Sequence, residues 1–422
     1  MLSLCSLMFS CRRTNVTEVR PISSTYQDSS KVLMVADEYP CMKLVTGNVV
    51  HLHAKGLDET QPYGIIQNGD PLALKCHYLP LETREECLVG QISQLDSDDS
   101  SVFILDTDNS SALRFSLKDG SFICKYGSSG RGPGEYISLD CMTINKKSKE
   151  VCLLDFSQYK LMYFSYDGEL LREEPQYYAY SRMEFCGENM VYRTGRSQND
   201  MAPGINHSRL VLAKTDQTPL FRGFPFAEHS YDNFNRVGNS SLHKCKDDVF
   251  YTYEMSDTIW QIKENGVCEA KYVFKFPGRD NLFDENDFLQ MTNDVYEKKT
   301  KDSPFFAGNI TITDNFIRAQ IYNGQAMLYC ISTGHYHYGH PSNRYFDGVK
   351  SFEGQLTLDG TSFVDVLQPF EILKHKESIK AINEATYNYF WNERLTEEER
   401  QLLQKMTPES NPILAIIDVE PF

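Results

Sequence analysis

Short apolar runs recur along the chain, and turn-forming dipeptides separate them. Residues 102–120 show a strand pattern, a turn, a second strand pattern and an Asp-Gly pair, and residues 151–168 repeat that order. Weaker copies of this unit begin near Asn189, Val249, Phe316 and Ser362. Asp-Gly and Asn-Gly pairs between apolar segments are strong hairpin signals. Units of about 40 to 50 residues with four short strands are typical of β-propeller blades. The pattern therefore predicts an all-β chain, a six-bladed β-propeller.

Two segments interrupt the strand pattern. Residues 284–299 are polar with apolar residues at helical spacing, and residues 377–406 show a second helical pattern. We expect both to be helical insertions. The continuous apolar run 412–419 then predicts a buried strand of blade six, which an N-terminal strand near residues 72–81 would complete. Residues 31–422 are thus expected to form one propeller, closed by strands from both ends of the chain.

The first residues differ from the rest. Residues 1–10 are largely apolar, and Cys11 follows them, then two arginines. This resembles a bacterial lipoprotein signal, in which the cysteine becomes the lipidated first residue of the mature protein. We interpret residues 1–11 as a signal segment, Cys11 as the lipid attachment site and residues 12–30 as a linker. The alternative is an ordinary chain terminus. Location on the periplasmic side or on the cell surface stays open.

Composition narrows the classes of partner. The 422 residues include 42 Lys and Arg against 58 Asp and Glu, a formal net charge of −16. This charge has the wrong sign for a protein that binds the phosphate backbone, so nucleic acid is not an expected partner. Aromatic residues make up 12% of the chain, which favours sheet over helix.

A glycine-rich segment links the first two clear repeats. It reads Gly127-Ser-Ser-Gly-Arg-Gly-Pro-Gly-Glu-Tyr136, and neither a Gly-Lys-Ser/Thr sequence nor an amphipathic helix follows it. A phosphate-binding loop is therefore disfavoured, and close turning of the backbone between blades is the better interpretation. The segment is similar to the linkers of NHL-type repeats. Together with Asn411-Pro-Ile-Leu-Ala-Ile416 it resembles a family of six-bladed β-propeller lipoproteins of Gram-negative bacteria. This resemblance implies an anchored extracytoplasmic propeller and no catalytic residues.

Candidate sites for metals and disulfides are few. His335, His337 and His340 have ligand-like spacing, but alternating His and Tyr also describes an ordinary outer strand, so we assign no metal. The aspartate-rich segments 96–99 and 106–110 are similar to calcium-binding loops, but neither has Gly at the sixth position or Glu at the twelfth. We therefore expect these aspartates to cap turns. Among the cysteines, Cys76 and Cys87 are the pair to test for a disulfide.

No recognised catalytic motif is present, and no cofactor is expected. Propellers commonly bind ligands at the mouth of the central channel, where loops of several blades converge. The leading hypothesis is a lipid-anchored binding or scaffold module of the cell envelope that recognises a peptide, a glycan or a partner protein. The alternative is an extracytoplasmic lyase or hydrolase with its site at the channel mouth. A cluster of His, Arg, Tyr and a metal on the axis would favour the enzyme, and aromatic residues blocking the channel would favour the binding module.

Overall fold

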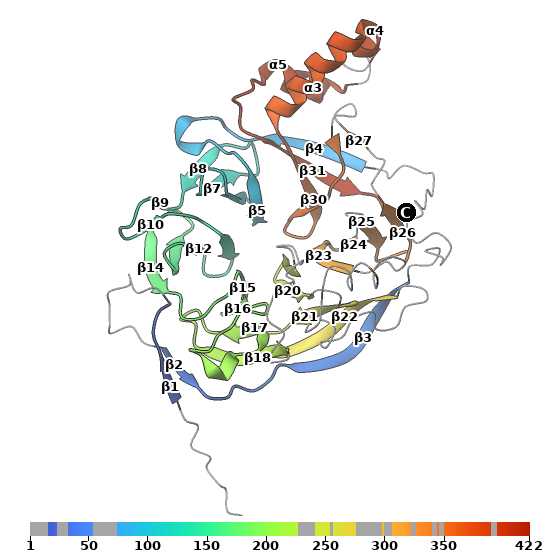
Figure 1. Cartoon of the computed structure of the whole chain (residues 1–422). Helices are drawn as coiled ribbons and strands as arrows, with labels where there is room; N and C mark the ends of the chain where they lie inside the picture. Colours follow the sequence, from blue (N-terminus) through green and yellow to red (C-terminus); the bar gives the residue numbers. More distant parts are fainter. Residues whose placement is uncertain are drawn as a thin grey trace, which may run out of the picture.

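Six sheets of four or five strands surround a common centre in the computed structural model (Figure 1). The prediction of a six-bladed β-propeller is confirmed. The structure describes residues 16–22, 33–53, 74–226, 241–253, 256–275, 298, 306–321, 326–339, 344–345, 350–389 and 395–422.

Blades one to five are each built from consecutive strands. Blade one contains β5 (Ile92–Ser97), β6 (Ser101–Asp106), β7 (Ser111–Ser116) and β8 (Phe122–Lys125). Blade two contains β11 (Cys141–Asn145), β12 (Glu150–Asp155), β13 (Lys160–Ser165) and β14 (Leu170–Pro175). Blade three contains β15 (Arg182–Cys186), β16 (Asn189–Arg193), β17 (Ser208–Ala213) and β18 (Pro219–Pro225). Blade four contains β19 (Leu242–Cys245), β20 (Asp248–Tyr251), β21 (Thr258–Ile262) and β22 (Val267–Lys275). Blade five contains β23 (Phe306–Ile312), β24 (Phe316–Ile321), β25 (Ala326–Cys330) and β26 (Tyr336–Gly339).

Short elements lie between these strands. They are the 3₁₀ turns η1 (Glu85–Cys87) and η2 (Pro203–Ile205) and the two-residue strands β9 (Ser128–Ser129), β10 (Glu135–Tyr136), β27 (Arg344–Tyr345) and β28 (Lys350–Ser351).

Blade six combines both ends of the described chain. Its order is β29 (Leu356–Leu358), β30 (Ser362–Leu367), β31 (Ile413–Val419) and β4 (Leu74–Pro80). Strand β31 pairs antiparallel with β30 on one side and with β4 on the other. The N-terminal strand thus provides the outer edge of the blade and the C-terminal strand lies inside it. This arrangement joins the ring without a gap in the hydrogen-bonded ladder of blade six.

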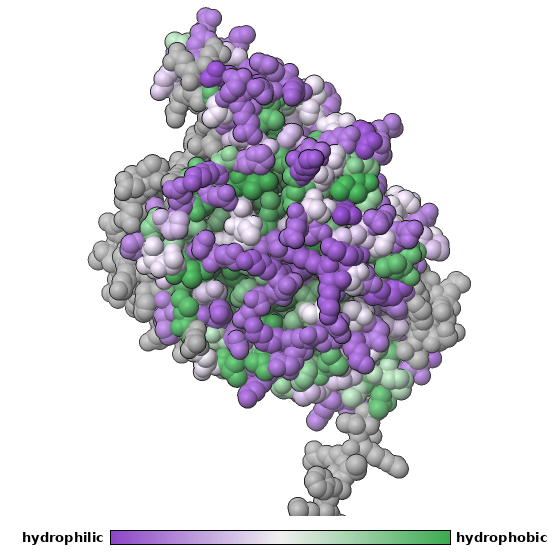
Figure 2. Space-filling view, turned by 180° about the vertical axis from the view of Figure 1, so that it is seen from behind, coloured by the Kyte–Doolittle hydropathy of each residue, from purple (hydrophilic) through white to green (hydrophobic). Residues whose placement is uncertain are grey.

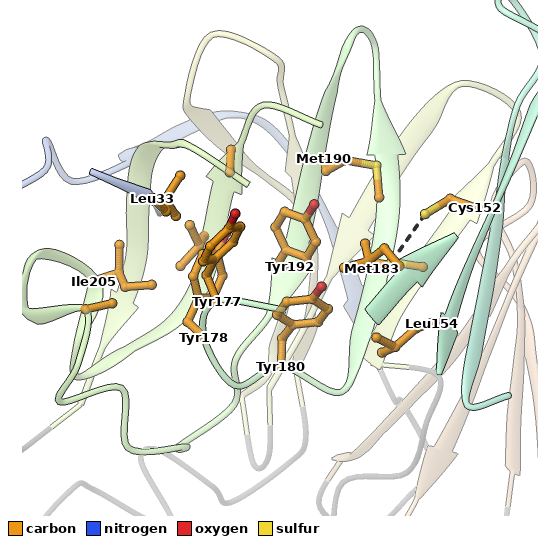
Figure 3. Close-up of a cluster of buried hydrophobic side chains, with 14 of the residues drawn as sticks. Leu33, Cys152, Leu154, Tyr177, Tyr178, Tyr180, Met183, Met190, Tyr192 and Ile205 are labelled. Carbon is orange, nitrogen blue, oxygen red and sulfur yellow. Dashed lines mark hydrogen bonds between the residues drawn. The ribbon is translucent and has the colours of Figure 1, made fainter. Parts of the chain in front are cut away.

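The continuous apolar runs of the sequence are the inner strands of the blades. All six residues of β6 are buried, and five of the six in β12. A strand inside a blade is covered by neighbouring blades on both faces, so both sets of alternating side chains must be apolar. Aromatic residues fill the space between blades. Between blades two and three, Tyr180 and Tyr192 pack with ring centroids 4.5 Å apart, and the Cys152 thiol lies 4.0 Å from the sulfur of Met183 (Figure 3).

The N-terminal segment wraps around the outside of the ring. Strand β3 (Lys43–His53) adds to blade four as a fifth strand, parallel to β22. Before it, β1 (Val16–Val19) and β2 (Leu33–Ala36) form a hairpin beside blade three (Figure 1). Val19 and Val35 are fully buried in the core of that blade. The segment assigned to a linker, residues 12–30, therefore includes a strand that packs against the propeller.

The helical insertion of blade six differs from its prediction. It consists of α3 (Pro369–Ile382), α4 (Glu384–Tyr387) and α5 (Glu397–Lys405), so it begins before residue 377 and is not one continuous helix. Asn383 leaves the helical conformation at the end of α3. At Thr396 a capping box with Glu399 starts α5 anew. The Tyr78 hydroxyl donates a hydrogen bond of 2.7 Å to Glu399 and joins α5 to β4. The insertion predicted at 284–299 lies outside the described residues.

The cysteine pair does not form a disulfide. Cys76 and Cys87 are both free thiols, and Cys87 is buried with its thiol donating to the backbone oxygen of Glu82 at 3.3 Å. Cys76 lies instead on β4, opposite Ile417 of β31. The pair that the sequence offered for testing as a disulfide is therefore not bridged in the structure.

Candidate functional site

The innermost strands of the blades meet around the axis and hold one another through side-chain to backbone hydrogen bonds. The backbone N–H of Met142 donates to the Gln94 side chain at 2.9 Å, which connects blades one and two. The N–H of Ile312 donates to Nε2 of His243 at 3.0 Å, which connects blades four and five. On the face shown in Figure 2, hydrophilic side chains gather around the centre of the ring. The axis is therefore polar and ordered by specific contacts.

Charged side chains cross the axis. Lys244 of blade four reaches Asp96 of blade one at 3.6 Å and donates a hydrogen bond of 2.6 Å to the backbone oxygen of Ile144. Lys146 and Asp359 form a second ion pair, between blades two and six. These pairs reduce the space on the axis to a cavity of about 90 Å³. Among the described residues, charged, neutral polar and aliphatic side chains line this cavity and no Phe, Tyr or Trp does. The cavity has room for only a few water molecules.

Two titratable groups in the axial cavity have shifted pKa values. Burial raises the pKa of Glu184 to about 7, against the opposing attraction of Lys244 and a 2.7 Å hydrogen bond from Thr143. Burial lowers the pKa of His243 to about 4, because the imidazole lies in an environment that disfavours its charged form. Burial therefore favours the uncharged form of both groups, so that the imidazole is neutral above about pH 4 and the carboxyl is mostly neutral only below about pH 7.

The larger space lies at one mouth of the axis. A groove of about 1000 Å³ runs between blade one, blade six and the start of the helical insertion. We call it the mouth groove. Its described lining consists of residues 88–93, 108–109, 309, 353, 355–356, 364–366, 368, 370–371 and 408–411. It shares Ser93, Gln355 and Leu356 with the axial cavity, so the two spaces adjoin.

The wall of the mouth groove at blade one is held by Asp106. Its carboxylate accepts hydrogen bonds from the backbone N–H groups of Gly90 at 2.7 Å and Gln91 at 3.0 Å. It also accepts from the N–H groups of Asp108 and Asn109 in the following turn. The interpretation of this aspartate as a turn cap is confirmed. One buried carboxylate therefore fixes two of the segments that line the groove.

The opposite wall is fixed in the same way. In blade six, Asp365 accepts from the N–H groups of Glu353 at 2.8 Å and Gly354 at 2.9 Å. Asn411 joins the two walls, because its side chain accepts from the N–H of Val89 at 2.8 Å and donates to the backbone oxygen of Cys87 at 2.8 Å. Asn411 is 3% exposed. The groove is thus formed before any ligand arrives, which reduces the entropy lost on binding.

The surface of the mouth groove combines apolar and acidic groups. Phe370 at the start of α3 is 51% exposed and Leu88 is 46% exposed, so two large apolar side chains are open to solvent on one lining. Asp108, Glu371 and Glu409 are exposed along the same lining. Sequence reasoning placed the site at a channel mouth but did not find these residues, because they come from three segments far apart in the chain.

The glycine-rich segment turns between blades one and two, as predicted. Strands β9 and β10 pair within it, and Gly127 has φ of +69°. A Cβ atom at Gly127 would lie 2.4 Å from the backbone oxygen of Gly134. The side chain of Glu135 closes the loop by accepting from the N–H of Gly132 at 2.7 Å. These contacts support a structural role for the glycines.

The histidines of blade five lie away from the mouth groove and contact the C-terminal residue. His335 Nδ1 lies 3.2 Å from the backbone oxygen of Phe422, and the His337 ring packs edge-on against the Phe422 ring at 4.4 Å. His340 and Cys11 lie outside the described residues. Within the part of the chain that the structure describes, no group of three or more His, Cys, Asp or Glu residues could hold a metal ion.

The axial cavity does not match the arrangement that would favour an enzyme. His243 and Arg182 line it, but no tyrosine does among the described lining residues. The Arg182 guanidinium donates to the backbone oxygen of Asp140 at 3.1 Å. Nε2 of His243 accepts the hydrogen bond from the backbone N–H of Ile312 that connects blades four and five. These polar groups hold the ring together. The mouth groove is therefore the better candidate for a functional site.

The fold and the groove define a six-bladed β-propeller with a preformed mouth groove. The chain belongs to the family described as "Domain of unknown function (DUF4934)", whose model matches residues 64–418. No curated protein matches it. No helix among the described residues is long and apolar enough to cross a bilayer.

Two solved structures of Bacteroides proteins are similar to this chain. A Bacteroides fragilis protein for which export has been proposed is 18% identical, with a TM-score of 0.63 over 90% of this chain and all of that chain. A member of the duf4221 family from Bacteroides vulgatus is 9% identical, with a TM-score of 0.44 over 84% of this chain and all of that one. At such identities the likeness concerns the fold alone.

Proposed function

We propose that this protein is a binding module of the cell envelope, held at a membrane through Cys11, and that it takes its partner in the mouth groove. The observation that carries the proposal is the preformed groove of about 1000 Å³ with Phe370 and Leu88 exposed on its surface. Ligand sites are typically concave, with apolar anchors and a few fixed polar groups. The likeness to a protein with proposed export supports the extracytoplasmic side.

A defined pair of variants tests the site. The purified protein is screened on arrays of synthetic peptides and of glycans, and each hit is measured again with Phe370→Ala and with Leu171→Ala. Leu171 is 48% exposed on β14 of blade two and is the matched apolar control. We expect hits to weaken about tenfold or more in Phe370→Ala, the usual effect of losing an aromatic anchor, and to stay unchanged in the control. Arrays without hits, or hits that are insensitive to Phe370, would refute the proposal.

A further inference from the structure

The charge along the mouth groove indicates the class of its partner. We propose that the groove binds an extended peptide segment in which lysine or arginine side chains flank an apolar residue. This inference rests on the proposed function, because it assumes that the mouth groove is the binding site.

The lining of the mouth groove carries charge of one sign. Five carboxylates line it, and none of the described lining residues is a lysine, arginine or histidine. The five are Asp108, Glu353, Asp365, Glu371 and Glu409. A concave surface of one charge concentrates the electric field and attracts ligands of the opposite charge. The net charge of −16 for the whole chain acts in the same direction.

The five carboxylates do not contribute equally. Asp365 is 3% exposed, and its oxygens accept the backbone N–H groups of Glu353 and Gly354. The largely buried guanidinium of Arg318 interacts electrostatically with Asp365 and Glu353 and offsets part of their charge. Asp108, Glu353, Glu371 and Glu409 are exposed to solvent. Because Arg318 offsets part of the charge of Glu353, we expect a ligand to respond most to Asp108, Glu371 and Glu409.

Asp108, Glu371 and Glu409 come from three separate segments of the chain. Asp108 follows β6 in blade one, Glu371 lies in the first turn of α3, and Glu409 precedes β31. All three line the mouth groove, as does the exposed ring of Phe370. A lysine or arginine side chain can lay its methylene groups on such an apolar surface while its charged end reaches a carboxylate. A peptide with alternating basic and apolar side chains satisfies both features of the groove at once.

The same lining disfavours the other classes of ligand. A neutral glycan can stack on the apolar ring and donate hydroxyl hydrogen bonds to the carboxylates, but it has no positive charge to neutralise them. Acidic glycans, acidic peptides and nucleic acids would meet repulsion, since like charges brought together across an interface are unfavourable. A basic peptide is the class that uses both the exposed apolar ring and the carboxylates.

The experiment uses the full chain and three fluorescent peptide pools of equal length. The pools share their apolar positions and carry Lys and Arg, Ser and Asn, or Asp and Glu at the others. The groove variant combines Asp108→Asn, Glu371→Gln and Glu409→Gln. The control variant combines Asp99→Asn, Glu169→Gln and Asp247→Asn, which removes the same charge. These three residues are exposed in the turns β5–β6, β13–β14 and β19–β20, at the other end of the ring.

We expect the basic pool to bind tightest, and added salt to weaken its binding. The groove variant should weaken that binding about tenfold, because each of three exposed charge contacts contributes a fraction of a kcal/mol. The control variant should leave it near the wild-type level. Equal binding by the three pools, or equal loss in both variants, would overturn the inference. If neutral peptides or glycans bind in a Phe370-dependent way, the mouth groove remains the binding site and only its proposed preference is wrong.

Discussion

Replacing Glu184 by Gln should stabilise the propeller at neutral pH and leave it unchanged in acid. Glu184 lines the axial cavity, and its pKa rises from the usual 4.5 to about 7. Between these values the folded protein holds a proton on Glu184 that the unfolded chain has lost. The contribution of Glu184 to stability therefore falls as the pH rises from 4.5 to 7. Gln has the shape of the protonated carboxyl and never ionises, so Glu184→Gln avoids this loss.

The size of the effect follows from the two pKa values. A rise from 4.5 to about 7 corresponds to about 3 kcal/mol at ~1.4 kcal/mol per pKa unit. Lys244 and Arg182 attract the ionised carboxyl and Asp96 repels it, and the pKa of about 7 already includes these influences. His243 acts in the opposite direction, because its pKa falls from 6.5 to about 4 and its contribution grows with pH across that interval. Wild-type stability should therefore vary little between pH 4.5 and 6.5.

The assay is urea unfolding followed by intrinsic fluorescence, from pH 4 to 8, for wild type, Glu184→Gln and a control, Glu188→Gln. Glu188 lies just after β15, and its side chain is 79% exposed. We expect the difference between Glu184→Gln and wild type to grow from near zero at pH 4.5 to about 3 kcal/mol above pH 7. The control should show a small difference with no such trend. A difference for Glu184→Gln that does not change with pH would show that Glu184 ionises normally in the folded protein.

Three further predictions concern closure, the glycine-rich turn and the anchor. Asn411→Ala should lower the free energy of unfolding by about 3 kcal/mol in urea, because three hydrogen bonds to the backbone of residues 82–89 are lost. A loss below about 1 kcal/mol would mean that the walls of the groove keep their positions without Asn411. Gly127→Ala should lower the thermal midpoint more than Gly195→Ala. Both glycines have positive φ, but only at Gly127 would the added Cβ atom lie within 4 Å of backbone atoms. Equal shifts would show that this backbone contact does not matter for stability. Cys11→Ala should move the protein from the membrane to the soluble fraction, and wild type and variant found equally soluble would remove the anchor.

The repeat could be recognised in the sequence because the blades share the same local pattern of apolar strands and capped turns. Strands β6 and β12 are continuous apolar runs, and each is followed by a turn that its last residue, Asp106 or Asp155, caps through backbone N–H groups. Such patterns arise from short-range geometry, in which two covered faces require apolar side chains and a tight turn requires a cap. The six blades could be counted for this reason.

The position of the N-terminal strand β3 beside blade four could not be predicted by the same reasoning. Strand β3 pairs parallel to β22, from Lys43↔Val267 to His53↔Lys275. Its partner is more than two hundred residues away, and its burial is one-sided and irregular, so no local period marks it. The helical insertion was placed in the correct region but divided incorrectly, because the end of α3 at Asn383 has no strong stop signal in the sequence.

The mouth groove shows why a site can be less predictable than the fold that carries it. Asp108, Phe370 and Glu409 line one groove only because β4 and β31 complete blade six and place the helical insertion beside blade one. In the sequence, each of these residues looks like an ordinary surface or turn residue. The combination of an exposed apolar ring and carboxylates in one groove arises only in the folded chain. Asn411→Ala should therefore weaken binding in the mouth groove, even though Asn411 is buried and contributes no charge. Normal ligand binding by Asn411→Ala would mean that the walls of the groove keep their positions without the hydrogen bonds of Asn411.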